Sequence, residues 1–150
     1  MSKEINLNIE KNDPPVEVSI LNKAEEIAEQ QFSDVGILSL RKDGIITFEP
    51  KEGKTTHTLE AMKVELDIFK KWAGNERLSF ISDNRTMKKF DADIRIYAQQ
   101  NLPLFCNKFA LIISSGISSF VTNIFIYMNR PGIPIKAFTN KEEAIIWLKE

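Results

Sequence analysis

The polar side chains best placed to do chemistry fall in two short loops, each after a strongly apolar run. Ser82–Thr86 begins with the last residue of the run LSFIS, and Ser114–Gly116 follows the run FALII. Ligands in open α/β sheets bind beyond the carboxyl ends of the strands, and hydroxyls with free backbone N–H groups suit an anion. Capping of the next helix is the alternative role for these residues. The ligand-binding candidates in these loops are Asp83, Asn84, Arg85, Ser114 and Ser115.

Arg95 is a further ligand-binding candidate. It lies in a predicted helix, one residue from the apolar stripe that contains Ile94. A guanidinium can bind a carboxylate or phosphate through two parallel hydrogen bonds. The alternative is a structural ion pair with Asp91 or a contact with the sheet.

The chain contains one histidine, His57, and one cysteine, Cys106. A lone cysteine forms no intramolecular disulfide, and with one histidine it makes no structural zinc site. We expect His57 to be a surface loop residue and Cys106 to be a small core residue. Because the sequence shows neither a nucleophile with a local base nor a glycine-rich phosphate loop, we predict no catalytic residue, no metal ligand and no cofactor.

The composition is that of one globular domain, with 43% hydrophobic and 27% charged residues in 150. A net charge of −1 indicates no general attraction to nucleic acid. The N-terminal residues have no apolar leader, and no run is long and apolar enough to span a bilayer. With the lone cysteine, this predicts a cytoplasmic protein.

Charge divides the chain into two parts. Met1–Asp34 has three Lys against eight Asp and Glu, whereas Val35–Glu150 has 17 Lys and Arg against 13 Asp and Glu. We therefore separate an acidic arm, residues 1–34, from a body, residues 35–150. The arm either lies against the mildly basic body or simply presents a second solvated face. Within it we predict a weak strand near Ile5–Ile9 and a short helix over Ala24–Phe32, which is rich in helix formers.

The body begins with a predicted β-hairpin. Val35–Leu40 and Ile45–Glu49 are β-rich runs, and Asp43-Gly44 between them favours a tight primed turn. Helical periodicity and capping residues then predict helices at 58–71, 87–100, 116–129 and 141–149. The runs at 78–82, 109–113 and 135–138 predict strands. Such alternation indicates an α/β fold with a mixed, mainly parallel sheet and helices packed on it.

The predicted helix at 116–129 is apolar nearly all round, as in a helix buried on most sides. A homodimer contact, an apolar or lipid-like pocket, or a more central position would each account for it. The residues that we assign to this interface or pocket are Phe120, Ile124, Phe125 and Met128.

The segment NRPGIPIKAFTNKEEAIIWL resembles the ending of one uncharacterised bacterial branch of the SpoIIAA-like group, which includes STAS and STAS/SEC14-type domains. The residues that carry the likeness are Asn129, Pro131, Pro134, Phe138, Thr139, Ala144, Trp147 and Leu148. Upstream, Arg95-x-Tyr97-Ala98, Ala110-Leu111, Asn123-x-Phe125 and the Asp43-Gly44 hairpin are also similar. The resemblance covers roughly Val35–Glu150 and implies a SpoIIAA-like fold.

STAS domains that antagonise anti-sigma factors carry a phosphorylated Ser or Thr in an Asp-Ser-x-Gly setting. This chain has Asp83-Asn84-Arg85-Thr86 there, without the glycine. From the resemblance we expect a non-enzymatic interaction or regulatory domain that is open to a regulatory protein partner. From the apolar helix at 116–129 we expect it to act as a homodimer. The alternatives are a carrier or sensor that binds a small apolar, lipid-like or anionic ligand and, third, an enzyme.

Overall fold

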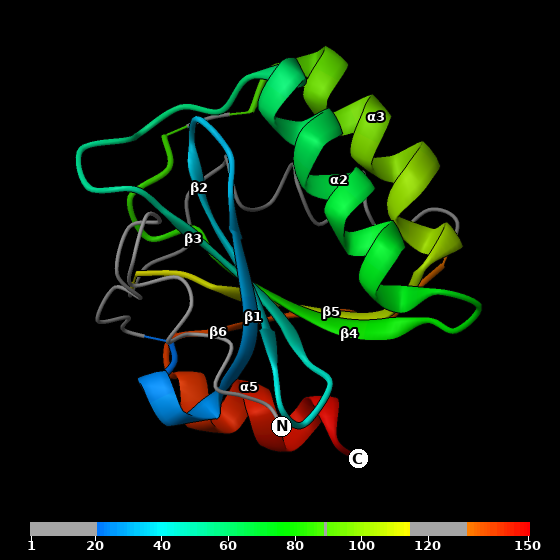
Figure 1. Ribbon diagram of the computed structural model, residues 1–150. Coiled ribbons are helices and arrows are strands. Elements are labelled where there is room, and N and C mark those ends of the chain that lie inside the picture. Colours follow the sequence, from blue (N-terminus) through cyan, green and yellow to red (C-terminus); the bar gives the residue numbers. More distant parts are fainter. Residues whose placement is uncertain (1–20, 89, 115–131) are drawn as a thin grey trace, which may run out of the picture.

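The computed structural model describes residues 21–88, 90–114 and 132–150 and shows an α/β fold on a six-stranded sheet (Figure 1). The strands lie in the order of the sequence, so each pairs with its neighbours in the chain. They are β1 (Ile27–Phe32), β2 (Gly36–Arg41), β3 (Ile46–Pro50), β4 (Leu78–Asp83), β5 (Cys106–Ile112) and β6 (Ile135–Phe138).

The sheet is mixed. β1, β2 and β3 pair antiparallel, whereas β3, β4, β5 and β6 pair parallel. Parallel neighbours require a crossover connection, and helices supply it between β3 and β4 and between β4 and β5. The carboxyl ends of β3, β4 and β5 therefore meet at one edge of the sheet.

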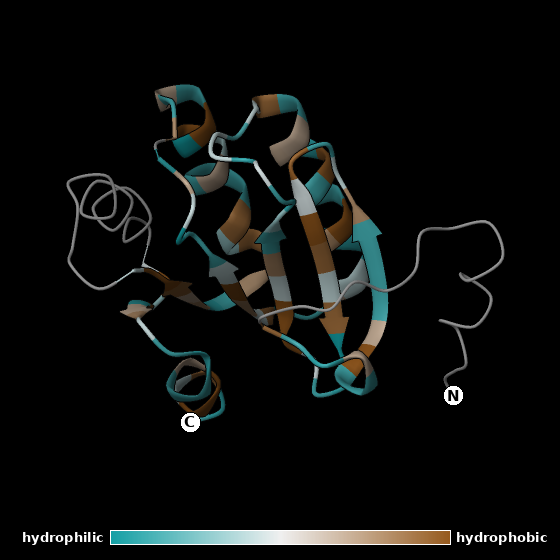
Figure 2. Cartoon of the chain, turned by 90° about the vertical axis from the view of Figure 1, so that its left-hand side faces the viewer, coloured by the Kyte–Doolittle hydropathy of each residue, from teal (hydrophilic) through white to brown (hydrophobic). Residues whose placement is uncertain are grey.

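Helices cover both faces of the sheet. α2 (Leu59–Ala73) and α3 (Ala92–Asn101) lie side by side on one face, and α5 (Lys141–Leu148) lies on the other (Figure 1). Two short 3-10 turns, η1 (Ala24–Glu26) and η2 (Leu102–Leu104), precede β1 and β5. Each face has its own apolar core, and Figure 2 shows apolar residues recurring along the strands between the helical layers.

Local sequence accounts for α2. The Thr58 hydroxyl accepts a hydrogen bond from the Ala61 backbone N–H at 3.1 Å, which caps the first turn. Gly74 ends the helix with a φ of 63°, a conformation that side chains disfavour. The stripe between these ends buries Leu66 and Phe69 against the sheet, as the helical period predicts.

Most predicted elements are confirmed, with small changes at their ends. The second helix is an exception, because it begins at Ala92 and not at Met87. The Lys88 N–H donates to the Thr55 carbonyl at 2.8 Å, and the Thr86 hydroxyl donates to the Lys54 carbonyl at 3.3 Å. These bonds hold the preceding loop against the segment before α2, so it cannot join the helix.

The predicted helix over Ala24–Phe32 is wrong. Only Ala24–Glu26 forms a 3-10 turn, and Ile27–Phe32 is the edge strand β1. Neighbours along this strand point to opposite faces: Trp72 donates its indole N–H to Glu29, whereas Gln30 donates to the Ser39 hydroxyl at 3.2 Å. Pairing with β2 therefore overrides the helix propensity, and residues 27–32 of the predicted acidic arm belong to the sheet.

The hairpin of β2 and β3 is confirmed, but its turn is longer than a two-residue primed turn. The Arg41 N–H donates to the Ile45 carbonyl at 2.9 Å, and the Gly44 N–H donates to the Arg41 carbonyl at 2.9 Å. The loop thus has three residues, Lys42, Asp43 and Gly44. Gly44 takes a φ of 87° at its end, as three-residue hairpin loops require.

A buried guanidinium fastens this hairpin to the segment before β1. Arg41 donates two hydrogen bonds to Asp43, at 3.0 and 2.8 Å, and one to the side chain of Asn22 at 2.9 Å. Partial burial alone would raise the pKa of Asp43, but hydrogen bonds from Arg41 and Lys149 lower it from 3.8 to about 2. The pKa of Arg41 is raised: burial opposes the charged form, and the bonds to Asp43 outweigh that cost. Asp43 also forms an ion pair with Lys149 at 3.1 Å, which connects the hairpin to the end of α5.

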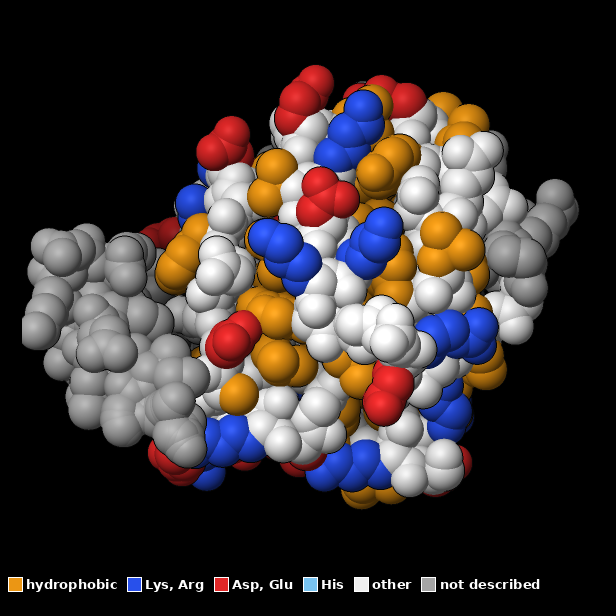
Figure 3. All heavy atoms as spheres, turned by 45° about the vertical axis from the view of Figure 1, so that its right-hand side comes forward, with side chains coloured by type: hydrophobic (Ala, Val, Ile, Leu, Met, Phe, Trp, Pro, Cys, Tyr) orange, Lys and Arg blue, Asp and Glu red, His pale blue; other side chains and the backbone are white. Residues whose placement is uncertain are grey.

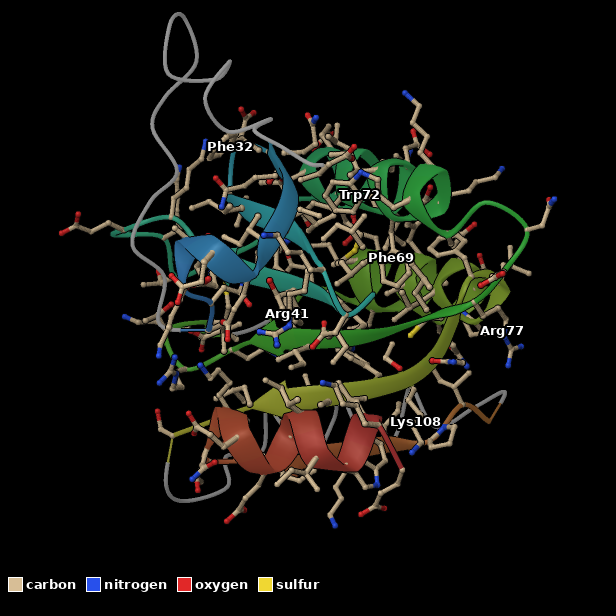
Figure 4. The ribbon with its side chains drawn as sticks, turned by 60° about the horizontal axis from the view of Figure 1, so that its bottom comes forward. Phe32, Arg41, Phe69, Trp72, Arg77 and Lys108 are labelled. Atoms are coloured by element: carbon tan, nitrogen blue, oxygen red, sulfur yellow. The ribbon has the colours of Figure 1, made fainter. Side chains whose placement is uncertain are left out.

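The end of α5 is held by β5. Lys108 donates to the Trp147 carbonyl at 2.8 Å and lies 4.8 Å from the centre of the Trp147 ring, at the C-terminal end of the helix (Figure 4). The same carbonyl accepts the Glu150 N–H at 3.3 Å, and a cation at this end of the helix also interacts favourably with the helix dipole. Among the described residues, no helix is long and apolar enough to cross a bilayer.

Two predictions fall outside the described residues. They are the weak strand near Ile5–Ile9 and the helix at 116–129, with its candidates Phe120, Ile124, Phe125 and Met128.

Acid titration tests the Asp43 network. A carboxyl whose pKa is lower in the folded state contributes stability above its unfolded pKa and loses it as the pH falls through the folded pKa. As the pH falls from about 5 to about 2, we therefore expect protonation of Asp43 to lower the free energy of unfolding by about 1 kcal/mol. This figure is reduced because Asp43 is partly exposed. Asp43→Asn should lack this share of the pH dependence in chemical denaturation. Asp34→Asn removes an exposed carboxylate and is the control; equal pH profiles for the two variants would contradict the assignment.

Gly36 is required by the close approach of Phe48. A Cβ at Gly36 would lie 2.3 Å from the Phe48 ring and 2.5 Å from the Glu49 carbonyl oxygen. The backbone oxygen cannot move aside cheaply, so Gly36→Ala should lower the free energy of unfolding by about 3 kcal/mol. Gly44→Ala meets no atom within 4 Å and should cost only the backbone strain of about 1 kcal/mol. Equal losses in denaturant melts of the two variants would show that the Phe48 contact is not limiting.

Candidate functional site

A cavity of about 60 Å³ lies between the sheet and the two helices on its α2 and α3 face. Three phenylalanine rings line its wall: the Phe69 ring meets the Phe80 ring edge to face at 5.2 Å, and the Phe80 ring stacks on the Phe109 ring at 5.0 Å. Phe69 projects from α2 toward the sheet (Figure 4). The remaining lining residues are Leu38, Phe48, His57, Met62, Glu65, Leu66, Ser82, Asn84, Phe90, Ile94, Arg95, Ala98, Leu102 and Leu111.

The cavity lies toward the carboxyl ends of the parallel strands. Phe48 of β3, Ser82 of β4 and Leu111 of β5 all line it, and Asn84 follows β4 directly. This is where ligands bind in open α/β sheets. Most of its polar lining is buried, whereas Met62, Phe90 and Arg95 are partly exposed and form its solvent side.

A buried carboxylate, Glu65, forms the polar end of the cavity. The side chain of Glu65 accepts from the Ser33 hydroxyl at 2.6 Å through one oxygen and lies 2.9 Å from His57 Nε2 through the other. Ser33 Oγ in turn accepts the backbone N–H groups of Val35 and Gly36, at 3.1 and 3.0 Å. Both carboxylate oxygens are thus satisfied, as a buried charge requires.

The His57 ring is held on all sides. Its Nδ1 lies 3.0 Å from both the backbone nitrogen and the carbonyl oxygen of Thr58, and its Nε2 lies 2.9 Å from Glu65 Oε1. The rings of Phe48 and Phe90 lie on either side, each 5.6 Å from the imidazole. The prediction that His57 is a surface loop residue is wrong, because only 7% of it is exposed.

The order of these groups differs from that of a hydrolytic triad. In such a triad the histidine lies between nucleophile and carboxylate, whereas here the carboxylate of Glu65 lies between Ser33 and His57. The Ser33 hydroxyl therefore donates to a carboxylate and not to a histidine, which is the base of a hydrolytic triad. The arrangement instead fixes three chain segments around one end of the cavity.

A second polar group faces the cavity from the end of β4. The Ser82 hydroxyl donates to Asn84 Oδ1 at 2.8 Å, which leaves the Asn84 amide nitrogen as a hydrogen-bond donor. Arg95 lines the cavity from α3 and donates from Nη1 to the Phe90 carbonyl. Asn84 and Arg95, both named from the sequence, are thus brought to one cavity.

The other sequence candidates are placed elsewhere. Asp83 and Arg85 do not line the cavity; they form a two-pronged ion pair with each other, at 2.8 and 2.7 Å. This hydrogen bonding raises the pKa of Arg85. Ser114 is exposed, and Ser115 lies outside the described residues.

Glu65, His57 and Ser33 are the site residues that the sequence did not reveal. Glu65 has one usable signal, since it lies three residues after Met62 and four before Phe69, within the apolar stripe of α2. A carboxylate on a buried stripe needs a partner. The sequence cannot name that partner, because Ser33 and His57 come from separate loops.

The Cys106 thiol is part of the apolar core. Cys106 is fully buried, as predicted, and this burial raises its pKa to about 12. Among the described residues, no group of three or more His, Cys, Asp and Glu side chains could hold a metal ion.

On the side of the molecule in Figure 3, apolar side chains form small groups separated by Lys, Arg, Asp and Glu. The large apolar side chains that are exposed among the described residues come from different elements: Val64 from α2, Ile96 from α3, Leu104 from η2 and Ile146 from α5. Scattered apolar residues of this kind are normal on a protein surface. Among the described residues, apolar side chains that a small molecule could contact are therefore gathered in the cavity and not on the surface.

Residues 38–150 match the family described as Domain of unknown function (DUF7793). The match includes every cavity-lining residue, whereas Ser33 precedes it. No curated protein and no solved structure matches the chain.

Replacing Glu65 tests the buried polar group. Glu65→Gln keeps the shape but offers one acceptor oxygen to two donors, the Ser33 hydroxyl and His57 Nε2. One donor loses its acceptor, so the free energy of unfolding should fall by about 2 kcal/mol in chemical denaturation. Glu60→Gln, on the exposed side of the same helix, should cost about 0.5 kcal/mol or less. A similar small loss for Glu65→Gln would show that the carboxylate is not needed.

Proposed function

This chain belongs to the DUF7793 family, and we propose that it binds a small molecule in the cavity between the sheet and helices α2 and α3. In this proposal the domain is a sensor or carrier of that ligand. The observation that carries it is an apolar cavity with a few polar groups at fixed positions. Ligand sites in proteins combine these two features, because apolar surface gives affinity and the polar groups set orientation.

Hydrogen bonding within the site favours binding over proton transfer. Both oxygens of Glu65 and both ring nitrogens of His57 are engaged by protein groups. A general base needs a lone pair within reach of the substrate proton. Glu65 and His57 would first have to give up a buried hydrogen bond.

The SpoIIAA-like arrangement is part of the same proposal. It is supported by a hairpin, β2 and β3, that leads into the parallel strands β4, β5 and β6. An interaction or regulatory domain acting as a homodimer remains the second proposal. The predicted contact for it, on residues 116–129, lies outside the described residues.

Filling the cavity tests the proposed function. Ala98 lines the cavity, and Ala98→Leu adds three carbon atoms there. A ligand-observed NMR screen of small molecules against the full chain should find binders whose affinity falls by about tenfold or more in this variant. Circular dichroism would confirm that the variant folds.

Ala92→Leu is the matched control, since Ala92 is exposed at the start of the same helix. It should leave every binder unaffected. If the binders lose equal affinity in both variants, or in neither, the cavity is not their site. If no molecule binds the unmodified chain at millimolar concentration, the proposed function is wrong.

A further inference from the structure

We infer that the ligand is a small uncharged molecule with one acceptor oxygen, the chemistry that short ketones, aldehydes and alcohols share. Its oxygen lies toward the Asn84 amide, and its hydrocarbon body lies toward the phenylalanine wall. This inference rests on the proposed function and adds the chemical class of the ligand. It follows from the charges, the buried amide and the size of the cavity.

Two opposite charges face the cavity. Glu65 lies at its polar end, where Ser33 and His57 engage the two carboxylate oxygens. Arg95 lines it from α3 and donates to the Phe90 carbonyl. An anionic ligand would therefore meet a carboxylate, and a cationic ligand would meet a guanidinium. Either ligand would also exchange its water of hydration for mostly apolar walls, a cost that one opposite charge does not offset beside a like charge. The lining favours an uncharged ligand.

One buried amide is left for the ligand. The Asn84 side chain lines the cavity, and only 5% of the residue is exposed. Its Oδ1 accepts from the Ser82 hydroxyl, whereas no described residue accepts from its amide nitrogen. A buried N–H donor without an acceptor costs free energy, and an oxygen of the ligand would remove that cost by accepting from it. The ligand therefore needs one acceptor oxygen.

Strand β4 sets the direction of the ligand. Phe80, Ser82 and Asn84 all line the cavity, at successive steps of two residues, or about 7 Å each. The Phe80 ring packs against the rings of Phe69 and Phe109. The lining thus changes from aromatic to polar toward the carboxyl end of the strand. A ligand with its oxygen at Asn84 lays its hydrocarbon body over these rings.

Size restricts the ligand to a short carbon chain. The cavity volume of about 60 Å³ holds roughly four water-sized groups. A molecule of roughly four or five heavy atoms is of this size. Long-chain lipids do not fit without movement of the helices.

The experiment is a ligand-observed NMR titration of the full chain with three probes of nearly one shape. Butanone is uncharged, propionate replaces one methyl group of butanone by a charged oxygen, and sec-butylammonium replaces its oxygen by a charged amine. Butanone should bind about tenfold more tightly than either charged probe, because it loses no hydration shell of an ion on entering the cavity. Binding of either charged probe as tight as that of butanone would overturn the inference.

Asn84→Asp tests the position of the ligand oxygen. The variant keeps an acceptor for the Ser82 hydroxyl and removes the amide donor. Butanone should bind about fivefold or more weakly than to the unmodified chain, and sec-butylammonium should bind more tightly. Asn107→Asp is the matched control, since Asn107 is exposed and its Oδ1 accepts from the Ser79 hydroxyl at 3.1 Å. It should leave both affinities unchanged.

Unchanged binding of butanone to Asn84→Asp would overturn the assigned oxygen position. If this variant does not fold, the side-chain amide signals of Asn84 in the proton–nitrogen NMR spectrum of the unmodified chain decide. They should shift as butanone binds. If they stay in place while the signals of other cavity residues shift, the oxygen does not lie at Asn84.

The outcomes separate this inference from the proposed function. Equal binding of the three probes, lost in Ala98→Leu, would overturn the uncharged class and leave the proposed function intact. If none of the three probes binds, the inference is wrong, and the proposed function then depends on the wider NMR screen.

Discussion

A buried carboxylate must be surrounded by hydrogen-bond donors. The donors to Glu65 of α2 come from two separate loops. Ser33 lies in the turn between β1 and β2, and His57 lies in the loop before α2. The Ser33 oxygen also closes its own turn through two backbone N–H groups. One charge on α2 thereby fixes the hairpin edge, the helix and the histidine loop relative to one another, and the cavity lies beside the point where they meet.

Sequence periodicity identified α2, β4, β5 and α5 because their apolar residues recur with the period of the element that they form. β1 was misassigned since AEEIAEQQF consists of helix formers, and only the ladder to β2 makes it a strand. The position of the cavity followed in part from the strand-end rule, which named Asn84, while Arg95 was named for its place beside an apolar stripe. That rule also named Asp83 and Arg85, but side chains alternate along a strand and these two pair with each other away from the cavity. Glu65, His57 and Ser33 act together only in the folded chain, so local patterns did not reveal them.

The two faces of the sheet differ in what they contain. The α5 face has a compact apolar core. Asp43 holds the end of α5 through its ion pair with Lys149, and Lys108 holds it through a hydrogen bond to the Trp147 carbonyl. The α2 and α3 face has the larger core, and its packing leaves the cavity beside buried polar groups. Rigid packing on one side thus supports a site on the other, an arrangement suited to holding polar groups at fixed positions.

The order of strands in the sheet bears on how the protein is made. Strands pair in the sequence in which they leave the ribosome, and the cavity walls, with Ser33 behind them, come from residues 33–111. The chain is synthesised from its N-terminus, so all the residues that line the cavity leave the ribosome before β6 and α5. Until then β5 is an open edge strand. Its last four residues, Phe109–Ile112, are buried in the finished fold and pair with β6. In the proposal that the cavity binds a ligand, that ligand would find all the lining residues on the nascent chain before the last strand pairs with β5.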